Sequence, residues 1–432
     1  MIPTRLKRIA GLTITVMAAV SLSSCIAYRA VRYGAPGIDD YRTFPQDTIH
    51  KGEQTFEFAE TPHEKRLFDT LRAFRSYGEL RTIHEALEAE NRKKNLSCGI
   101  LIIRNDSVIY ENYQGRIQRN AVSTVFSVSK SLTALLCGIA IDEGHIKSVN
   151  DPVTDYLPEL RKADPRFAHL TIEHLLDMRA GLKFNENYSF NPFSAMARLH
   201  YGRNMLRQMK HLKFEEEPGT SFRYCSMVTA ILGIVIERAV GRSYADYMSE
   251  KVWKPLGMED NALMSVDAVR KRYPRSYGGI STTARDLAKV GRLYLNHGCF
   301  DGRQIVDSAW VETTLSAVRA HNNTQNAIRG YSYSWWHERR PILNEDGTSY
   351  LFIDKESAMQ RCRDLGLPDA TVGAVKGTDK YRAFRDEEFP QMVGMLGQVV
   401  YIDSSRNLIL VILTNRELAS LIETVFDSLD KH

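Results

Sequence analysis

Two pairs of apolar, strand-like segments lie near opposite ends of this 432-residue chain. The first, "CGILIIRNDSVIYENY" (residues 98–113), has apolar runs on both sides of Asn105-Asp106, which indicates a hairpin. The second, "GQVVYIDSSRNLILVILTN" (residues 397–415), has apolar runs on both sides of a polar turn. Both pairs neighbour helical segments, so we expect them to form one discontinuous sheet covered by terminal helices.

The remaining chain is mostly helical in pattern. Residues 63–94 predict two helical pieces, and "ELASLIETVFDSLD" (residues 417–430) predicts an amphipathic C-terminal helix. Between the strand pairs, residues 149–269 are rich in helical patterns and turns, which indicates an inserted helical subdomain. The expected fold class is therefore α+β, an antiparallel sheet flanked by N- and C-terminal helices, within one domain over residues 61–430.

The N-terminus has the pattern of a secretory signal peptide over residues 1–24: basic "TRLKR", apolar "IAGLTITVMAAV", then "SLSSC". Leu22-Ser23-Ser24-Cys25 resembles a bacterial lipobox, which predicts cleavage before Cys25 and lipidation of that cysteine. The other interpretation is a transmembrane anchor, but about 13 apolar residues are few for a span. We expect an irregular tether over residues 25–60 and a lipid anchor in a bacterial envelope membrane. Ile26, in place of an aspartate, favours the outer membrane.

Charge and cysteine content exclude several functions. The formal charge is +5, but the first 24 residues hold three cations and no acid, so the rest carries only +2. That balance does not predict nucleic-acid binding. The five cysteines beyond Cys25 are scattered and form no CxxC pair, so they indicate neither a disulfide framework nor a zinc site. We expect no metal and no cofactor.

The stretch "VFSVSKSLTALL" places Ser127 and Lys130 three residues apart at the start of a helix expected to run to Asp142, with Gly144 as its C-cap. Residues at this spacing share a helix face, so the lysine can reach the serine hydroxyl. The unpaired N–H of Ser127 at a helix N-terminus could also stabilise an oxyanion. The same residues are also compatible with the polar first turn of a helix that is otherwise buried in the core.

Two further segments favour the chemical interpretation. Tyr224 lies in "RYCS", just before an apolar helix, where its phenol could share a proton with a lysine. Gly394 and Gly397 are the first and last residues of "GMLG", just before a late strand. Glycine at these positions allows close approach of substrate to the backbone. Alone, the first is also compatible with an ordinary half-buried aromatic and the second with a β-bulge.

The order of these motifs resembles the serine β-lactamase and penicillin-binding-protein superfamily. Specifically, it resembles the class C branch of that superfamily, with its esterase and 6-aminohexanoate-oligomer hydrolase relatives. Supporting stretches include "TVFSVSKSLTALL", "PGTSFRYCSMVTAILGIVIERAVG", "YGGISTTARDLAKVGRLYLNHG" and "GMLGQVVYID", between residues 124 and 403. The resemblance implies a β-lactamase/transpeptidase-like fold and a serine hydrolase that forms an acyl-enzyme.

The resemblance also implies roles for individual residues. Ser127 corresponds to the acylated nucleophile, Lys130 to its proton partner and Tyr224 to the tyrosine that assists proton transfer. The N–H of Met395 corresponds to the second oxyanion donor, beside that of Ser127. Three residues are expected to contact substrate: Ser226, Tyr188 and Gly394.

One departure bears on the substrate. β-Lactamases and DD-peptidases have Lys-Thr-Gly on the late strand, whereas this strand reads "QMVGMLGQ" and has no cation. Lys376 in "VKGTD" lies about twenty residues too early, inside a long polar insertion (residues 344–385) that could be a flap or surface decoration. We therefore expect a small-molecule or peptide-like ester or amide as substrate. The alternatives are a DD-peptidase or β-lactamase, and a non-catalytic binding lipoprotein.

Overall fold

The computed structural model describes residues 26–61, 74–76, 79–85, 87–88, 95–189, 191–342, 351–366, 371–375 and 378–418. The expected signal peptide and Cys25 lie outside the described residues. So does most of the expected N-terminal helical region and nearly all of the C-terminal helix. Within the N-terminal region the helical prediction is wrong for β3 (Phe74–Ser76) and β4 (Glu79–Arg81), which pair as an antiparallel hairpin. Ile83 and Leu87, in a described helical piece, pack against the strands of the central sheet.

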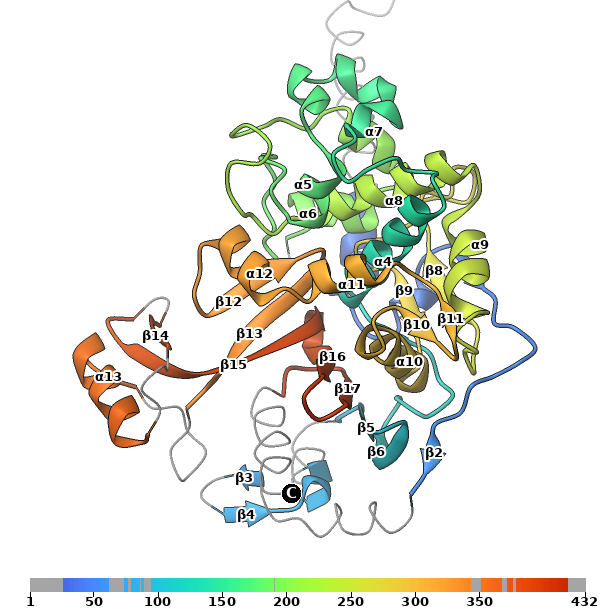
Figure 1. Cartoon of the computed structure of the whole chain (residues 1–432). Helices are drawn as coiled ribbons and strands as arrows, with labels where there is room; N and C mark the ends of the chain where they lie inside the picture. Colours follow the sequence, from blue (N-terminus) through green and yellow to red (C-terminus); the bar gives the residue numbers. More distant parts are fainter. Residues whose placement is uncertain are drawn as a thin grey trace, which may run out of the picture.

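A nine-stranded sheet forms the centre of the molecule (Figure 1). β2 pairs with β6 in parallel, and every other pairing in the sheet is antiparallel. Its strand order is β12 (Arg329–Ser332), β13 (Trp335–Pro341), β15 (Tyr381–Gly394), β16 (Gln398–Asp403), β17 (Leu408–Thr414), β5 (Cys98–Arg104), β6 (Ser107–Gln114) and β2 (Ala59–Glu60), with β14 (Thr371–Ala374) also paired to β15.

The pairing of β17 with β5 joins the two ends of the chain. Its register runs from Leu408 opposite Arg104 to Thr414 opposite Cys98. Each strand also belongs to one of the hairpins predicted from sequence, β5–β6 and β16–β17. Asn105 and Asp106 form the first turn with φ values of 51° and 58°, in the left-handed region that Asn and Asp tolerate. The discontinuous sheet is therefore confirmed.

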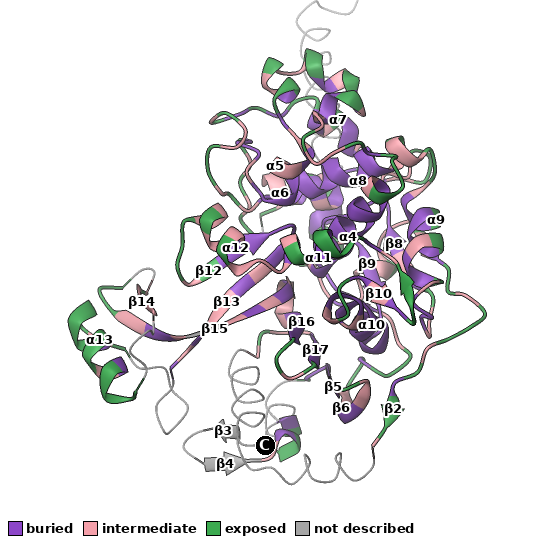
Figure 2. Ribbon diagram, in the orientation of Figure 1, coloured by how far each residue is buried: buried purple, intermediate pink, exposed green. Residues whose placement is uncertain are grey.

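Three long helices pack against this sheet and one another to form the core: the apolar helices α4 (Val128–Asp142) and α8 (Ser226–Val240), and the amphipathic helix α10 (Ala284–Leu295). α10 packs on β16 and β17, where Gly291 brings its backbone against Ile409. α4 lies between β15 and α8, and both helices are almost wholly buried (Figure 2). The other described helices are shorter: α5 (Ile172–Leu176), α6 (Ala195–Tyr201), α7 (Met205–Met209), α9 (Tyr244–Met248), α11 (Ser308–Thr314), α12 (Ala317–Thr324) and α13 (Lys355–Asp364).

Residues 26–60 differ from the expected irregular tether. Residues 26–33 are helical and pack against the domain, and β1 (Gln46–Ile49) pairs with β8 (Ala262–Ser265). This small sheet continues through β9 (Ile280–Thr282) to β7 (Ser123–Thr124), the strand that leads into Ser127. The N-terminal segment is therefore part of the structure around the candidate site. The sequence does not predict this, because backbone pairing between distant segments leaves no local signal.

The polar insertion forms a projection at the far end of β15 (Figure 1). Its described part contains β14 and α13 around a small separate core of Ile342, Cys362 and Ala383. None of these residues lines the cavity beside Ser127. In its described part the insertion thus decorates the surface and does not cover that cavity.

Candidate active site

Ser127 immediately precedes α4, and Lys130 lies one turn later on the same face. The Lys130 ammonium donates hydrogen bonds to Ser127 Oγ at 2.8 Å and to the backbone carbonyl of Tyr277 at 2.8 Å. Only 1% of Lys130 is exposed. A buried ammonium held directly on a hydroxyl is an arrangement through which a proton can pass between nitrogen and oxygen.

The backbone around Ser127 exposes its own N–H. Phe126 adopts a left-handed φ of 47°, which is strained for a bulky aromatic residue and typical of functional turns. The next two amides, of Val128 and Ser129, donate to the carbonyls of residues 125 and 126. Among the hydrogen bonds of the described residues, none uses the Ser127 N–H. That donor is therefore available at the helix N-terminus, as the sequence predicts.

Tyr224 lies on the other side of Lys130, just before α8. The Lys130 ammonium is 5.0 Å from the centroid of its ring. The ring also stacks on Trp336, with centroids 5.4 Å apart and planes 24° apart, and meets Tyr331 edge-on at 6.0 Å. This aromatic contact fixes the tyrosine beside the lysine. The structure thus brings together Ser127, Lys130 and Tyr224.

Gly394 and Met395 approach the same site from the sheet. β15 ends at Gly394, and a 3₁₀ turn over Met395–Gly397 leads into β16. A Cβ at Gly394 would collide with the carbonyl oxygen of Val125, two residues before Ser127. Met395 lines the same cavity as Ser127. The end of β15 and the start of α4 are thus in backbone contact, the condition for two N–H groups to face one oxyanion.

Glu186 is a site residue that the sequence analysis missed. Its carboxylate accepts the backbone N–H of Ser226 at 2.9 Å and the Ser226 hydroxyl at 2.5 Å. The Tyr188 hydroxyl donates to the same carboxylate at 2.5 Å. A carboxylate at this position is stabilised by the N-terminus of α8. Ser226 and Tyr188, both expected near substrate, are therefore joined through Glu186, which lies two residues before Tyr188 in the sequence.

Tyr188 lies at the border between protein and solvent. About half of its side chain is exposed, at 51%. Desolvation, with added repulsion from the neighbouring Tyr224 and Glu186, raises the pKa of Tyr188 well above its ordinary value near 10. The phenol therefore stays protonated at physiological pH and can donate a hydrogen bond, but it cannot serve as a base there.

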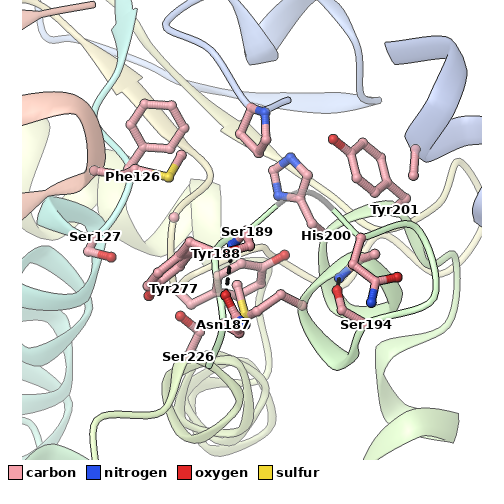
Figure 3. Close-up of a pocket in the computed structure, with 17 residues that line it drawn as sticks. Phe126, Ser127, Asn187, Tyr188, Ser189, Ser194, His200, Tyr201, Ser226 and Tyr277 are labelled. Carbon is pink, nitrogen blue, oxygen red and sulfur yellow. Dashed lines mark hydrogen bonds between the residues drawn. The ribbon is translucent and has the colours of Figure 1, made fainter. Parts of the chain in front are cut away.

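A cavity of about 690 Å³, including its open mouth, lies beside Ser127 (Figure 3). Ser127 at the start of α4 and Ser226 at the start of α8 face it, and the N-terminal segment runs along the opposite side. Residues 187–201 supply most of the remaining wall. Its lining contains no lysine or arginine, and most of the exposed lining surface is apolar. The cavity therefore suits an uncharged, largely apolar acyl group.

Within the described chain, no three His, Cys, Asp or Glu side chains form a group that could bind a metal ion. Four of the five described cysteines are buried and all are free thiols, as expected of small core residues. His337 is also buried, with Nε2 2.9 Å from the carbonyl of Thr314, which makes it structural. The polar side chains that line the cavity are hydroxyls, the amides of Asn187 and Asn191 and the imidazole of His200. The Lys130 ammonium and the Glu186 carboxylate lie next to it, hydrogen-bonded to the lining residues Ser127 and Ser226.

The start of α4 thus places the serine and the buried lysine of a Ser-x-x-Lys sequence beside this cavity. The chain matches the family described as Beta-lactamase over residues 81–421, and it belongs to that family. It is 31% identical to a 6-aminohexanoate-dimer hydrolase of Paenarthrobacter ureafaciens over 251 residues, 55% of this chain and 63% of that protein. It is 27% identical to esterase EstB of Burkholderia gladioli over 206 residues, 43% of this chain and 52% of the esterase. Each match thus spans less than two thirds of the relative.

Among solved structures, a putative 6-aminohexanoate-dimer hydrolase from Bacillus anthracis superposes with a TM-score of 0.67. The superposition covers 90% of each chain at 18% identity, so it shows the fold alone. That fold confirms the α+β, β-lactamase-like architecture expected from the sequence.

Proposed function

We propose that this protein hydrolyses an ester or an amide through an acyl-enzyme on Ser127. The observation that carries the proposal is the 2.8 Å contact between the buried Lys130 ammonium and Ser127 Oγ, with Tyr224 against the same ammonium. A serine hydroxyl is a weak nucleophile until a neighbouring group takes its proton. Here the neighbours available for that task are a lysine and a phenol.

The acylation step starts from the Lys130–Tyr224 pair with one proton removed, either as a neutral Lys130 amine beside the phenol or as an ammonium beside a phenolate. Ser127 Oγ then attacks the substrate carbonyl carbon while its proton passes to this pair. The carbonyl oxygen becomes an oxyanion that the N–H groups of Ser127 and Met395 stabilise. When this intermediate collapses, the bond between carbon and the leaving oxygen or nitrogen breaks. The leaving alcohol or amine takes the proton held by the pair.

Deacylation uses the same groups in reverse. A water molecule gives its proton to the Lys130–Tyr224 pair and attacks the acyl carbon. The bond to Ser127 Oγ then breaks, the proton returns to the serine, and a carboxylic acid leaves. Trp336 holds the Tyr224 ring in place through both steps.

Two features favour esters and amides over β-lactams and D-Ala-D-Ala peptides, whose carboxylates need a cation. Gln391 and Met392 occupy the late strand before Gly394, and Gln391 donates to Glu338 at 2.8 Å. Glu186, which is hydrogen-bonded to the lining residues Ser226 and Tyr188, instead places a carboxylate next to the cavity, which would repel a substrate carboxylate. The same carboxylate would attract a substrate that carries an amine.

We also propose that Cys25 is lipidated and anchors the protein in a bacterial envelope membrane, as the "LSSC" motif predicts. Among the described residues, no helix has the length and apolarity required to cross a bilayer. The mass of the mature chain from bacterial membranes tests this anchor. The mass of a diacylglyceryl group on Cys25 is expected, and an unmodified N-terminus would contradict it.

A substrate panel tests the proposed activity. We expect wild-type protein to hydrolyse 4-nitrophenyl butyrate or a 6-aminohexanoate dimer at least about 1,000-fold faster than Ser127→Ala. Nitrocefin, a β-lactam, is expected to be hydrolysed far more slowly than the ester. Turnover of nitrocefin with no turnover of ester or amide would establish the β-lactamase alternative instead.

A further inference from the structure

The helix at residues 26–33 forms part of the wall of the candidate active-site cavity. Ala30 on its inner face is fully buried and packs against Ala197 and Tyr201 of α6. The Tyr201 hydroxyl donates to the carbonyl of Gly34 at 2.5 Å, which fixes the end of the helix. Ala30 and Pro36 both line the cavity. Anything attached to the start of this helix is therefore held near the cavity.

The outer face of the same helix is apolar and exposed. Tyr28 is 60% exposed and Val31 is 66% exposed, and Arg32 lies on the same face. Phe193, on the loop that borders the cavity, is 68% exposed. Single exposed apolar residues are common, but several on elements around one cavity mouth indicate an interaction surface.

A basic hollow lies beside this helix. It shares Tyr201 with the active-site cavity and also contains Tyr33 and the exposed Val269. Its charged residues are Arg29, Arg203, Arg270, Arg275 and Asp267. Asp267, Arg29 and Arg275 are buried, and Asp267 accepts the backbone N–H groups of Met205 and Tyr273. The exposed charge of the hollow therefore comes from Arg203 and Arg270 and is positive. Arginines beside exposed apolar side chains favour a surface of anionic lipid headgroups.

The position of the predicted lipid anchor matches this face. Cys25 is bonded to Ile26, the first described residue of the helix, and Ala30 follows four residues later. Four residues of helix rise about 6 Å, so the described end of the helix at Ile26, to which Cys25 is bonded, lies only about 6 Å along the helix axis from Ala30 at the cavity wall. The lipid, the exposed apolar residues and the arginines would then all contact the same bilayer surface.

We propose that the anchor face, formed by residues 26–33, Phe193 and Val269, lies on the membrane and holds the cavity mouth at the lipid surface. The substrate class that this orientation selects is an amphipathic acyl ester or amide that resides in the bilayer. The inference rests on the proposed hydrolase function and on lipidation of Cys25. It goes beyond both, because a lipid anchor alone sets no orientation.

A fluorescence experiment tests the orientation without using activity. The lipidated protein is reconstituted in anionic vesicles with and without brominated acyl chains, in Phe193→Trp, Val31→Trp and Val318→Trp variants. Val318, on α12, is 74% exposed and lines neither cavity, so its variant is the matched control. Three of the native tryptophans, Trp253, Trp310 and Trp335, are buried, which limits their quenching by lipid.

We expect brominated lipid to quench the fluorescence added by Phe193→Trp and Val31→Trp at least about twofold, because these side chains enter the acyl boundary. The Val318→Trp signal should not change. Equal quenching at all three positions, or quenching at Val318→Trp alone, would overturn the orientation.

An activity experiment tests the substrate class. Val31→Asp and Phe193→Asp should each lower hydrolysis of 4-methylumbelliferyl oleate in vesicles about tenfold, because a carboxylate resists insertion. Hydrolysis of the water-soluble acetate ester should stay at the wild-type rate, and Val318→Asp should change neither rate. Equal losses on both esters would overturn the substrate class. If wild type hydrolysed neither ester, the hydrolase proposal would fail, whereas the quenching result would still decide the orientation.

Discussion

Gly394, the last residue of β15, lies so close to the carbonyl oxygen of Val125 that no Cβ fits between them. This contact sets the distance between the two backbone segments that carry the proposed oxyanion donors. A Gly394→Ala substitution must push the segments apart by several tenths of an ångström. We expect kcat to fall about 10- to 100-fold, because oxyanion donors act only at close range.

Gly37→Ala is the matched control for that substitution. Gly37 has no heavy atom within 4 Å of an added Cβ and no left-handed φ. Its variant should keep wild-type turnover. The measurement is kcat for steady-state ester hydrolysis by both variants. A Gly394→Ala enzyme with wild-type kcat and wild-type melting temperature would show that this contact does not set the spacing of the oxyanion donors.

Tyr224→Phe separates chemistry from packing. The substitution keeps the ring on Trp336 and beside Lys130 but removes the phenolic proton. We expect kcat to fall about 100- to 10,000-fold with little change in thermal midpoint, since general acid–base catalysis contributes that much. Tyr331→Phe alters the same aromatic cluster and should keep most of the activity. Equal losses in both variants would show that Tyr224 only packs.

Glu186→Ala removes the acceptor shared by Ser226 and Tyr188. Loss of these hydrogen bonds at the N-terminus of α8 frees the loop that borders the cavity. We expect KM to rise about tenfold, from about 1.4 kcal/mol of lost positioning, with a smaller change in kcat. Tyr188→Phe removes one of the three bonds and should have a weaker effect. A Glu186→Ala variant with unchanged KM would exclude this positioning role.

Glu237 provides a test of stability against pH. Desolvation raises the pKa of this carboxyl to about 7, although it accepts the backbone N–H of Tyr244. Between its ordinary value near 4.5 and 7, the folded chain holds a proton that the unfolded chain has released. The free energy of unfolding contributed by this group therefore falls as pH rises through that window.

Glu237→Gln removes this dependence because the amide stays neutral. We expect the variant to be more stable than wild type at pH 8, by about 2 kcal/mol after allowance for partial solvation, and nearly equal to it at pH 4.5. Thermal melts at the two pH values measure the difference. Glu312→Gln, at an exposed position, is the control. An equal shift at both pH values would contradict the burial argument.

The sequence predicts those parts of the site that short-range spacing determines. A serine and a lysine three residues apart on a helix must share a face, and the structure places Lys130 Nζ on Ser127 Oγ. Both hairpins of the sheet were predictable because turn residues separate their apolar runs. The catalytic roles of Ser127 and Lys130 stay predictions until they are measured.

The sequence does not predict contacts between distant loops and strands. Glu186 lies in an irregular segment, and its partner Ser226 is forty residues later, so no periodicity marks it. The aromatic-rich stretch "YSYSWWH" (residues 331–337) contains no Gly, Asn or Pro that would indicate a turn. It nevertheless ends β12 and begins β13, because Tyr333 and Ser334 adopt left-handed φ values between them. The packing of residues 26–33 on α6 likewise has no local signature.

The most direct test of the central claim is the intact mass of the mature protein after reaction with a fluorophosphonate. We predict one covalent adduct on wild type and none on Ser127→Ala, because only an activated serine hydroxyl displaces fluoride. Peptide mapping should place the adduct on Ser127. An adduct on both proteins, or on neither, would contradict the assignment of Ser127 as the nucleophile.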